Sequence, residues 1–314
     1  MIGRRLTLGA VLIAAIGGAL GCSQVQTSDG APSAQADQAI LDGTAATDAK
    51  YNAIGALMYE TAGGLNQACS GTLVAKKAVV TARHCMKYID QAKAAGKPIY
   101  FGFGADMLAP DQLIPIKSYV AAPPSKNGQG LLQDGGRDVA VVYLKSAPAH
   151  IQPAKLGEFD ADMLGKKFQI AGFGISDFFG DYGQRFVGSG TARALKGYWY
   201  PLLFNSDKQA FLDWYWTDSA DAEPSDAQAE TWWTTYMLET GYELLAAGLP
   251  GESTACYGDS GGPLFLEKKS GDLKVYGVSF AVEATYSSIC GLGNGFLIFN
   301  DKMLDFVQTA IGKD

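Results

Sequence analysis

A serine lies in the glycine-rich segment Gly258-Asp-Ser-Gly-Gly-Pro263, and the residues around it suit a nucleophile. Gly258 permits a sharp turn that would aim the backbone amides of Gly258 and Ser260 at one point, where an oxyanion forms during acyl transfer. Asp259 must face away from the serine and, once buried, needs a cation as its partner. Gly, Asp and Ser are also ordinary loop residues, so a solvated turn is the alternative.

The chain has two histidines, and a serine nucleophile needs a base to take its proton. His84 ends the segment Val79-Val-Thr-Ala-Arg-His84 after an apolar run, whereas His150 lies in a proline-containing loop. The base in turn needs a third group that fixes its tautomer. Asp138 is the candidate, because it stands at the head of the apolar run 139–144 and a buried aspartate usually has a partner.

These motifs resemble those of the trypsin-like serine peptidases of chymotrypsin fold: Thr-Ala-Arg-His-Cys around His84, Asp-Val-Ala-Val-Val from Asp138, and Gly-Asp-Ser-Gly-Gly-Pro around Ser260. Their order, with separations of 54 and 122 residues, is also the order of that family. The resemblance covers about residues 40 to 312 and implies a peptidase in which Ser260 attacks, His84 relays the proton and Asp138 orients His84. It departs at Arg83, which replaces the usual alanine and which we expect to point to solvent.

The resemblance implies an all-β fold of two six-stranded antiparallel Greek-key barrels, with the active site between them and a helix at the C-terminus. Short apolar runs bounded by turns, in a chain with 39 glycines, also favour β architecture. Strands of the first barrel are expected at 53–59, 71–74, 78–81, 99–102, 113–120 and 138–144. Strands of the second are expected at 167–172, 185–195, 262–266, 273–280 and 295–298, and apolar residues at helical spacing predict the helix over 301–311.

The stretch 197–249 lengthens the chain before the serine and holds all five tryptophans, at positions 199, 214, 216, 232 and 233. Its second half, 227–247, has a composition that favours helix. The aromatic residues could form a rim for a substrate or partner. We favour the alternative that this insertion packs its own small core, because buried aromatic residues are commoner than displayed ones.

The resemblance and the positions of the cysteines imply two disulfides, Cys69 with Cys85 and Cys256 with Cys290. Each bridge would stabilise the fold by about 3 kcal/mol. A metal site is the alternative for four cysteines, and we disfavour it because the chain has no closely spaced Cys-x-x-Cys pair. The fifth cysteine, Cys22, is left over for another use.

The first 22 residues are typical of an export signal, because two arginines precede an apolar run over 6–20 and small residues follow it. Ala19-Leu-Gly-Cys22 resembles a bacterial lipobox, in which Cys22 carries lipid, and the odd cysteine count favours this over ordinary signal cleavage. Residues 23–39 have the composition of a disordered tether or propeptide. The peptidase domain would then occupy 40–314 of an outer-membrane lipoprotein, or of a periplasmic or secreted protein.

Ile40-Leu-Asp-Gly43 follows the tether. In the family that the chain resembles, cleavage before such a segment frees an α-ammonium group that pairs with the aspartate beside the serine. The resemblance therefore implies that Ile40 supplies the cation that Asp259 needs. A plain first strand in an uncleaved chain is the alternative.

The resemblance also assigns the primary pocket that receives the substrate side chain, with walls at Thr254, Ser279, Phe280, Ala281 and Gly295. With Thr254 rather than an acid at its base, a Lys or Arg side chain would lose its hydration without gaining a partner. Ala281 adds a methyl group at the entrance, so small or medium uncharged side chains are expected. We expect Glu283, two residues further, to face solvent.

The composition limits the partners. A net charge of −7 without basic clusters argues against nucleic acid, and 314 residues with 47% hydrophobic content can bury one or two sizeable cores. We expect a monomer that acts on protein or peptide substrates without a cofactor or metal. The alternative from another class is a catalytically silent peptidase fold used for binding, although such proteins usually lack a member of the catalytic triad.

Overall fold

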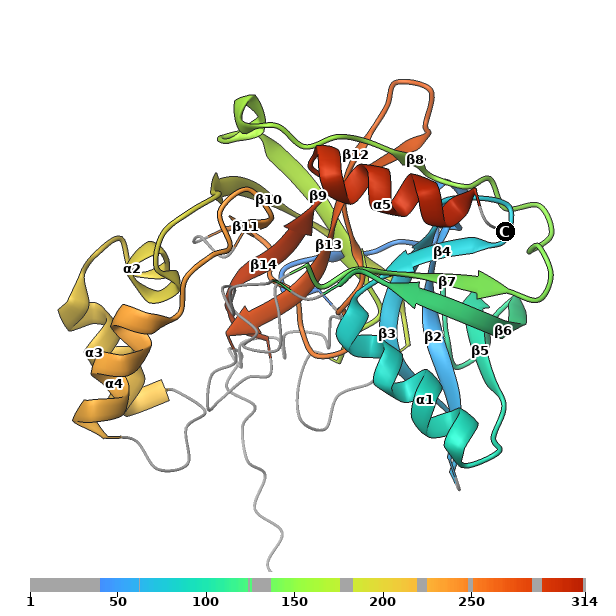
Figure 1. The fold of residues 1–314 in the computed structure, drawn as a ribbon, viewed down its shortest axis with the longest axis horizontal. Helices are drawn as coiled ribbons and strands as arrows, with labels where there is room; N and C mark the ends of the chain where they lie inside the picture. The colour runs from blue at the N-terminus through green and yellow to red at the C-terminus, as the bar shows by residue number, and fades with distance from the viewer. Residues whose placement is uncertain are drawn as a thin grey trace, which may run out of the picture. The chain divides into compact units, whose positions relative to one another are not determined.

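The computed structural model describes residues 40–61, 63–123, 125, 137–175, 183–218, 225–247, 251–283 and 290–312, which lie in one compact unit of the chain. This unit is built mainly of β-strands (Figure 1). None of its described helices is both long enough and apolar enough to cross a membrane. The expected export signal and tether lie outside the described residues.

Six antiparallel strands close into the first barrel in the order β2-β3-β4-β7-β6-β5. Their bounds are β2 Ile54–Thr61, β3 Gly64–Leu73, β4 Ala78–Thr81, β5 Ile99–Phe103, β6 Gln112–Ala121 and β7 Ala140–Leu144. The six expected strands are present, but β3 begins at Gly64 rather than at residue 71. Its first half is polar and half-exposed, so no apolar run marks it, and it is held by pairing with β2.

A second sheet follows, with strands β9 Lys167–Gly172, β10 Phe186–Ala194, β11 Glu243–Ala246, β12 Pro263–Glu267, β13 Leu273–Glu283 and β14 Leu292–Ile298. Their antiparallel pairings run β9-β10-β11-β14-β13-β12 and return to β9, so six strands form a closed circuit. A short strand, β1 (Thr44–Ala45), adds to β10. Another, β8 (Lys155–Leu156), pairs with β13 in parallel, which departs from the expected all-antiparallel arrangement.

Two further elements differ from the sequence-based expectation. The helix favoured over 227–247 ends as α4 (Asp226–Thr235), and Glu243–Ala246 forms β11 instead. All four residues of β11 are buried between β10 and β14, so tertiary pairing overrides their helical composition. An unexpected helix, α1 (Met86–Ala94), follows His84 and buries Met86, Ile89 and Ala92 on one face.

The insertion forms three helices, α2 (Trp199–Leu203), α3 (Lys208–Asp218) and α4, which lie together at the left of Figure 1. Its aromatic residues pack on one another as we expected. Tyr200, Phe211 and Trp214 are buried, and the Tyr200 ring stacks on Trp232 with ring centres 5.4 Å apart. Trp216 is the exposed exception among the tryptophans, at 48%. The C-terminal helix α5 spans Asp301–Ile311, as predicted.

Candidate active site

His84 and Asp138 form a hydrogen-bonded pair within the first barrel. His84 lies in the single 3-10 turn η2 (Arg83–Cys85), directly after β4, and Asp138 lies just before β7, which pairs with β4. The backbone amide of His84 donates to Asp138 Oδ1 at 2.8 Å, and the ring Nδ1 lies 2.5 Å from Oδ2. Asp138 is only 2% exposed, so water competes little for these bonds.

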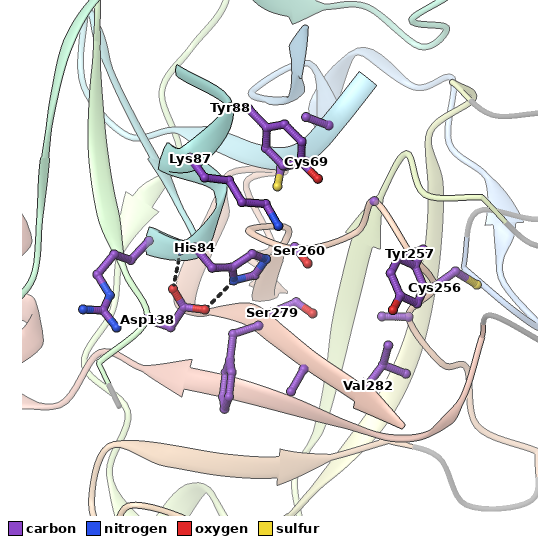
Figure 2. Close-up of a pocket in the computed structure, with 16 residues that line it drawn as sticks. Cys69, His84, Lys87, Tyr88, Asp138, Cys256, Tyr257, Ser260, Ser279 and Val282 are labelled. Carbon is purple, nitrogen blue, oxygen red and sulfur yellow. Dashed lines mark hydrogen bonds and ion pairs between the residues drawn. The ribbon is translucent and has the colours of Figure 1, made fainter. Parts of the chain in front are cut away.

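This pairing decides which ring nitrogen of His84 is free. A carboxylate accepts hydrogen bonds and cannot donate them, so in the neutral imidazole Nδ1 carries the proton and Nε2 has the lone pair. Figure 2 shows Ser260 on the side of the imidazole opposite Asp138, where Nε2 lies. The structure therefore brings together the three residues that the sequence motifs single out. His150, the other histidine, is exposed in a loop outside the cavity that holds them.

The loop before β12 (residues 256–262), which we call the serine loop, presents backbone amides beside Ser260. Asp259 N donates to Cys256 O at 3.1 Å, which closes a turn in which Gly258 has φ +95°, a conformation that favours glycine. Within the described residues, the amides of Gly258 and Ser260 have no hydrogen-bond partner in the protein. Both are thus free to donate to a negatively charged oxygen.

The first barrel also holds this loop, through residues that the motifs did not reveal. Ser70, fully buried in β3, donates through its hydroxyl to Gly258 O at 3.0 Å and through its amide to Ser260 O at 2.8 Å. Gln67 Nε2 donates to the same Gly258 oxygen at 2.9 Å. Ser70 and Gln67 thereby position the serine loop relative to His84. Neither belongs to a recognisable local pattern, so the sequence alone gave no signal for them.

A cavity of about 570 Å³ opens beside these groups. His84, Asp138 and Ser260 line it together with Ser279, Phe280 and Ala281 from β13. Several further lining residues lie outside the catalytic motifs, among them Lys87, Tyr88, Tyr257 and Val282. Arg83, which we expected to point to solvent, is half-buried and forms part of the wall.

Thr254 and Gly295, the other two residues expected in the primary pocket, do not line this cavity. Thr254 is 6% exposed and its backbone pairs with Leu41, with N···O distances of 2.9 and 3.1 Å. Gly295 lies behind the wall, because a Cβ atom added there would come within 3.1 Å of Ala281 Cβ and 3.2 Å of the Phe280 ring. Both therefore support the lining segments from outside.

Asp259 is 1% exposed and faces away from the cavity. Its carboxylate accepts hydrogen bonds from the amides of Gly174 and Cys256, each at 2.7 Å. Burial nevertheless raises the pKa of Asp259 to about 8. No cationic side chain of the described residues pairs with it. Ile40 is buried, and its neighbour Leu41 pairs with Thr254. Thr254 in turn lies in the segment that leads into the serine loop.

Glu283 was expected to face solvent, and this expectation is wrong. The residue keeps some exposed surface, but its carboxylate accepts a hydrogen bond from Tyr200 Oη at 3.0 Å. Burial of the carboxylate raises the pKa of Glu283 to about 7. Tyr200 belongs to α2, which the insertion places beside the end of β13.

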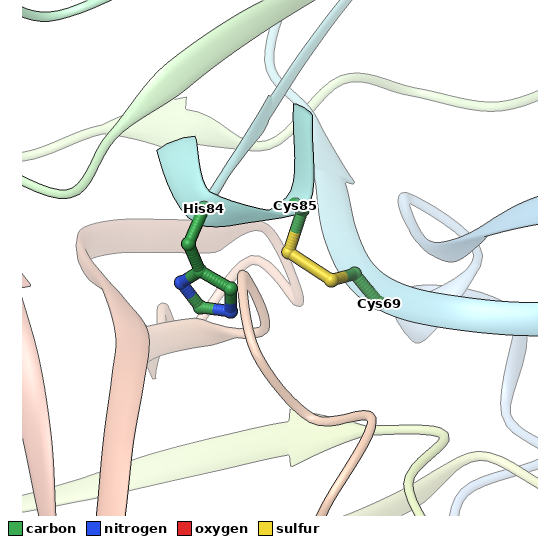
Figure 3. A group of neighbouring side chains, drawn as sticks. All are labelled: Cys69, His84 and Cys85. Carbon is green, nitrogen blue, oxygen red and sulfur yellow. A yellow bond between two sulfur atoms is a disulfide. The ribbon is translucent and has the colours of Figure 1, made fainter. Parts of the chain in front are cut away.

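The structure contains the two expected disulfides, Cys69–Cys85 and Cys256–Cys290. Such bonds persist in oxidising compartments, such as the extracellular space or the periplasm. Potential ligand atoms of Cys69, His84 and Cys85 lie within 4.8 Å of one another, close enough to hold a metal ion. The two sulfurs are bonded to each other (Figure 3), and a disulfide offers no thiolate to a metal.

Comparisons with known proteins identify the family and the fold of this chain. The family described as Trypsin matches residues 40–195 and 224–298, and so leaves out part of the insertion. A solved structure described as HL collagenase has 17% sequence identity and a TM-score of 0.56, over 87% of this chain and 99% of that one. At this identity the likeness carries the fold alone. No curated protein matches the chain. Because the family match spans most of the sequence and both sheets, the chain belongs to the trypsin family.

Proposed function

We propose that this protein is a serine endopeptidase in which Ser260 is the nucleophile, His84 the base and Asp138 the residue that orients His84. The observation that carries the proposal is the geometry of one cavity. A carboxylate-bound imidazole faces a serine there, beside the backbone amides of Gly258 and Ser260, which have no partner among the described residues.

In the proposed reaction, His84 Nε2 takes the proton of the Ser260 hydroxyl as the oxygen attacks the carbonyl carbon of the scissile peptide bond. The resulting oxyanion accepts hydrogen bonds from the amides of Gly258 and Ser260. The imidazolium then gives its proton to the leaving amine, and the C–N bond breaks to leave an acyl ester on Ser260. Water repeats the sequence with His84 as base and releases the acid.

A fluorophosphonate probe tests this assignment, because it reacts with an activated serine and not with ordinary hydroxyl groups. We expect the active protein to be labelled, and both Ser260→Ala and His84→Ala to lose labelling and to lower turnover by orders of magnitude. His150→Ala is the matched control and should react like the parent protein. Equal labelling of Ser260→Ala would show that another residue is the nucleophile.

For specificity, we propose a preference for small or medium uncharged side chains at P1, the residue whose carbonyl is attacked. Of the charged residues that line the cavity, Arg83 and Lys87 are cations and Asp138 is bound to His84, so a Lys or Arg at P1 would meet no free carboxylate. Peptides that differ only at P1 should be cleaved about tenfold better with Ala or Val than with Lys. The reverse order would overturn this preference.

We also propose that cleavage of the Ala39-Ile40 bond activates the protein. The support is the buried carboxylate of Asp259, which has no cationic side chain beside it in the part of the chain that the structure describes, and the pairing of Leu41 with Thr254 in the segment before it. N-terminal sequencing of active protein should find Ile40. An uncut active chain would refute the scheme, and an Ile40 terminus in isolated Ser260→Ala protein would show that the cut is not self-made.

For location, we propose export by residues 1–22, lipid on Cys22 and a tether over 23–39 that joins an outer membrane to the peptidase domain at 40–314. The support is the lipobox-like segment and the two disulfides, which use the other four cysteines. Cys22→Ser should move the protein from the membrane fraction to the soluble fraction. Equal membrane recovery of both forms would favour secretion after ordinary cleavage.

A further inference from the structure

A second cavity of about 270 Å³ lies next to the catalytic one. Helices of the insertion and the end of β13 line this cavity, which we call the aromatic pocket: Trp199, Tyr200, Trp232, Tyr236, Ala281, Val282 and Glu283. Ala281 and Val282 line the catalytic cavity as well. A ligand that extends from Ser260 along β13 would therefore reach the aromatic pocket.

The walls of the aromatic pocket suit a cation. Tyr200 and Trp232 stack on each other at 10° with ring centres 5.4 Å apart, so the faces they turn to each other are closed, and Tyr236 stands edge-on to Tyr200. These rings line the cavity with apolar surface, and a carboxylate attracts a cation more strongly in such surroundings than in water. Glu283 adds a carboxylate to the same wall. An apolar ligand would leave this carboxylate enclosed without a counter-charge, whereas a cation would balance it.

The edge of β13 offers a path for a peptide. β12 pairs with β13 only as far as Val278, while β14 continues along the other edge to Glu283. Beyond Ser279, therefore, no described strand pairs with the β12 side of β13. An extended peptide can add to such an edge through backbone hydrogen bonds. The edge begins beside the nucleophile, because Gly261 N donates to Ser279 O at 2.7 Å.

The proposed chemistry fixes which half of the substrate lies there. His84 protonates the leaving amine, so the leaving half lies on the imidazole side, and the acyl half extends along β13 away from it. Ala281 and Val282, the first residues of β13 to line the aromatic pocket, are two and three residues beyond Ser279, so an extended chain with P1 at Ser279 reaches them after about 7 to 10 Å at about 3.3 Å per residue. The side chain that reaches the aromatic pocket thus belongs to the third or fourth residue of the acyl half, P3 or P4.

We propose that the aromatic pocket binds the cationic side chain of a Lys or Arg at P3 or P4 of a peptide substrate, and this inference rests on the proposed peptidase function. The raised pKa of Glu283 agrees with a carboxylate that has no counter-charge among the described residues. The polar groups that face it, Tyr200 and Trp199, are both uncharged and come from α2, and its strand partner Leu292 is apolar.

Peptides that share a small P1 residue and differ at P3 or P4 test the proposal. Lys is compared there with norleucine and with acetyl-lysine, which keep the apolar stem and lack the charge. We expect kcat/KM to be about tenfold higher for Lys than for either neutral analogue. Glu283→Gln should bring this ratio close to one. Glu267→Gln, which removes a partly exposed carboxylate that pairs with Lys50, is the matched control and should keep the parent ratio.

If Glu283→Gln fails to fold, the parent protein still tests the inference, because the ratio of kcat/KM for the Lys peptide to kcat/KM for the acetyl-lysine peptide is measured without a variant. Equal cleavage of all three peptides would overturn the inference and leave the peptidase function in place. A Lys preference that survives in folded Glu283→Gln would also overturn it. Absence of fluorophosphonate labelling would instead overturn the proposed function, and the inference with it.

Discussion

Asp259 has surroundings that disfavour its charge in the uncut chain. Its carboxylate is enclosed, accepts hydrogen bonds from backbone amides and has no cation beside it among the described residues. The pKa of this group rises from 3.8 to about 8 on folding. The folded chain therefore holds a proton over this pH range that the unfolded chain releases. Stability from this group is complete below pH 3.8 and is lost as the pH rises towards 8.

This linkage predicts how the stability of uncut protein depends on pH. In a Ser260→Ala background, which prevents self-processing, the free energy of unfolding should fall more between pH 5 and pH 8 than it does in a Ser260→Ala, Asp259→Asn double variant. Urea denaturation at both pH values measures this difference. Parallel pH profiles for the two proteins would show that Asp259 does not titrate in this range.

Asp138→Asn tests the tautomer of His84. An asparagine amide in place of the carboxylate can donate to Nδ1, which would move the imidazole proton to Nε2 and remove the lone pair that faces Ser260. We expect kcat to fall about 10,000-fold while the fold survives. Asp160→Asn is the control and should keep the parent rate, because Asp160 is an exposed residue that caps the 3-10 helix Ala161–Met163. Near-parent turnover of Asp138→Asn would refute the role given to Asp138.

At the scale of elements, the disulfide between Cys69 and Cys85 ties β3 to the turn that carries His84. It closes a loop with a sequence separation of 16 residues. Replacing both cysteines by alanine should lower the free energy of unfolding by about 3 kcal/mol. Urea denaturation with and without reductant checks this, because reductant should affect the double variant less than the parent. An unchanged midpoint would show that the bridge does not stabilise the fold.

Most of the strands could be predicted because each leaves a short apolar run in the sequence. Short patterns around His84, Asp138 and Ser260 likewise single out residues that the structure brings into one cavity. β11 leaves no such mark, because its composition favours helix and only pairing with β10 and β14 makes it a strand. The aromatic pocket could not be predicted either. Glu283 meets Tyr200, which is 83 positions away, and no local pattern encodes a contact between an insertion and the end of a strand.

At the scale of the whole molecule, the candidate site is divided between the two sheets. His84 and Asp138 belong to the first barrel and Ser260 to the second sheet, and Ser70 joins them. Its hydroxyl donates to Gly258 O and accepts from Phe173 N at 3.1 Å. Gly258 and Phe173 both belong to the half of the molecule that is built around the second sheet. The distance from nucleophile to base therefore depends on how the two halves pack together.

Ser70→Ala should consequently lower kcat more than it raises KM, because it loosens the serine loop without touching the substrate. The variant also leaves the buried amide of Phe173 without its partner, while Gly258 O keeps the bond from Gln67, so a loss of about 1–3 kcal/mol in unfolding free energy should accompany the effect. Steady-state kinetics and urea denaturation measure the two effects separately. Ser118→Ala, in β6, is the matched control. Unchanged kcat in Ser70→Ala would show that the loop holds its position without this contact.

The pairing of Leu41 with Thr254 sets the time course of the proposed activation. These backbone bonds already hold the start of the folded unit against the segment that leads to Ser260. A cut at Ala39-Ile40 would then require no slow rearrangement of the serine loop, only the departure of the residues upstream. Peptidase activity should rise in step with the fraction of cut chains, without a lag between bond cleavage and the first turnover.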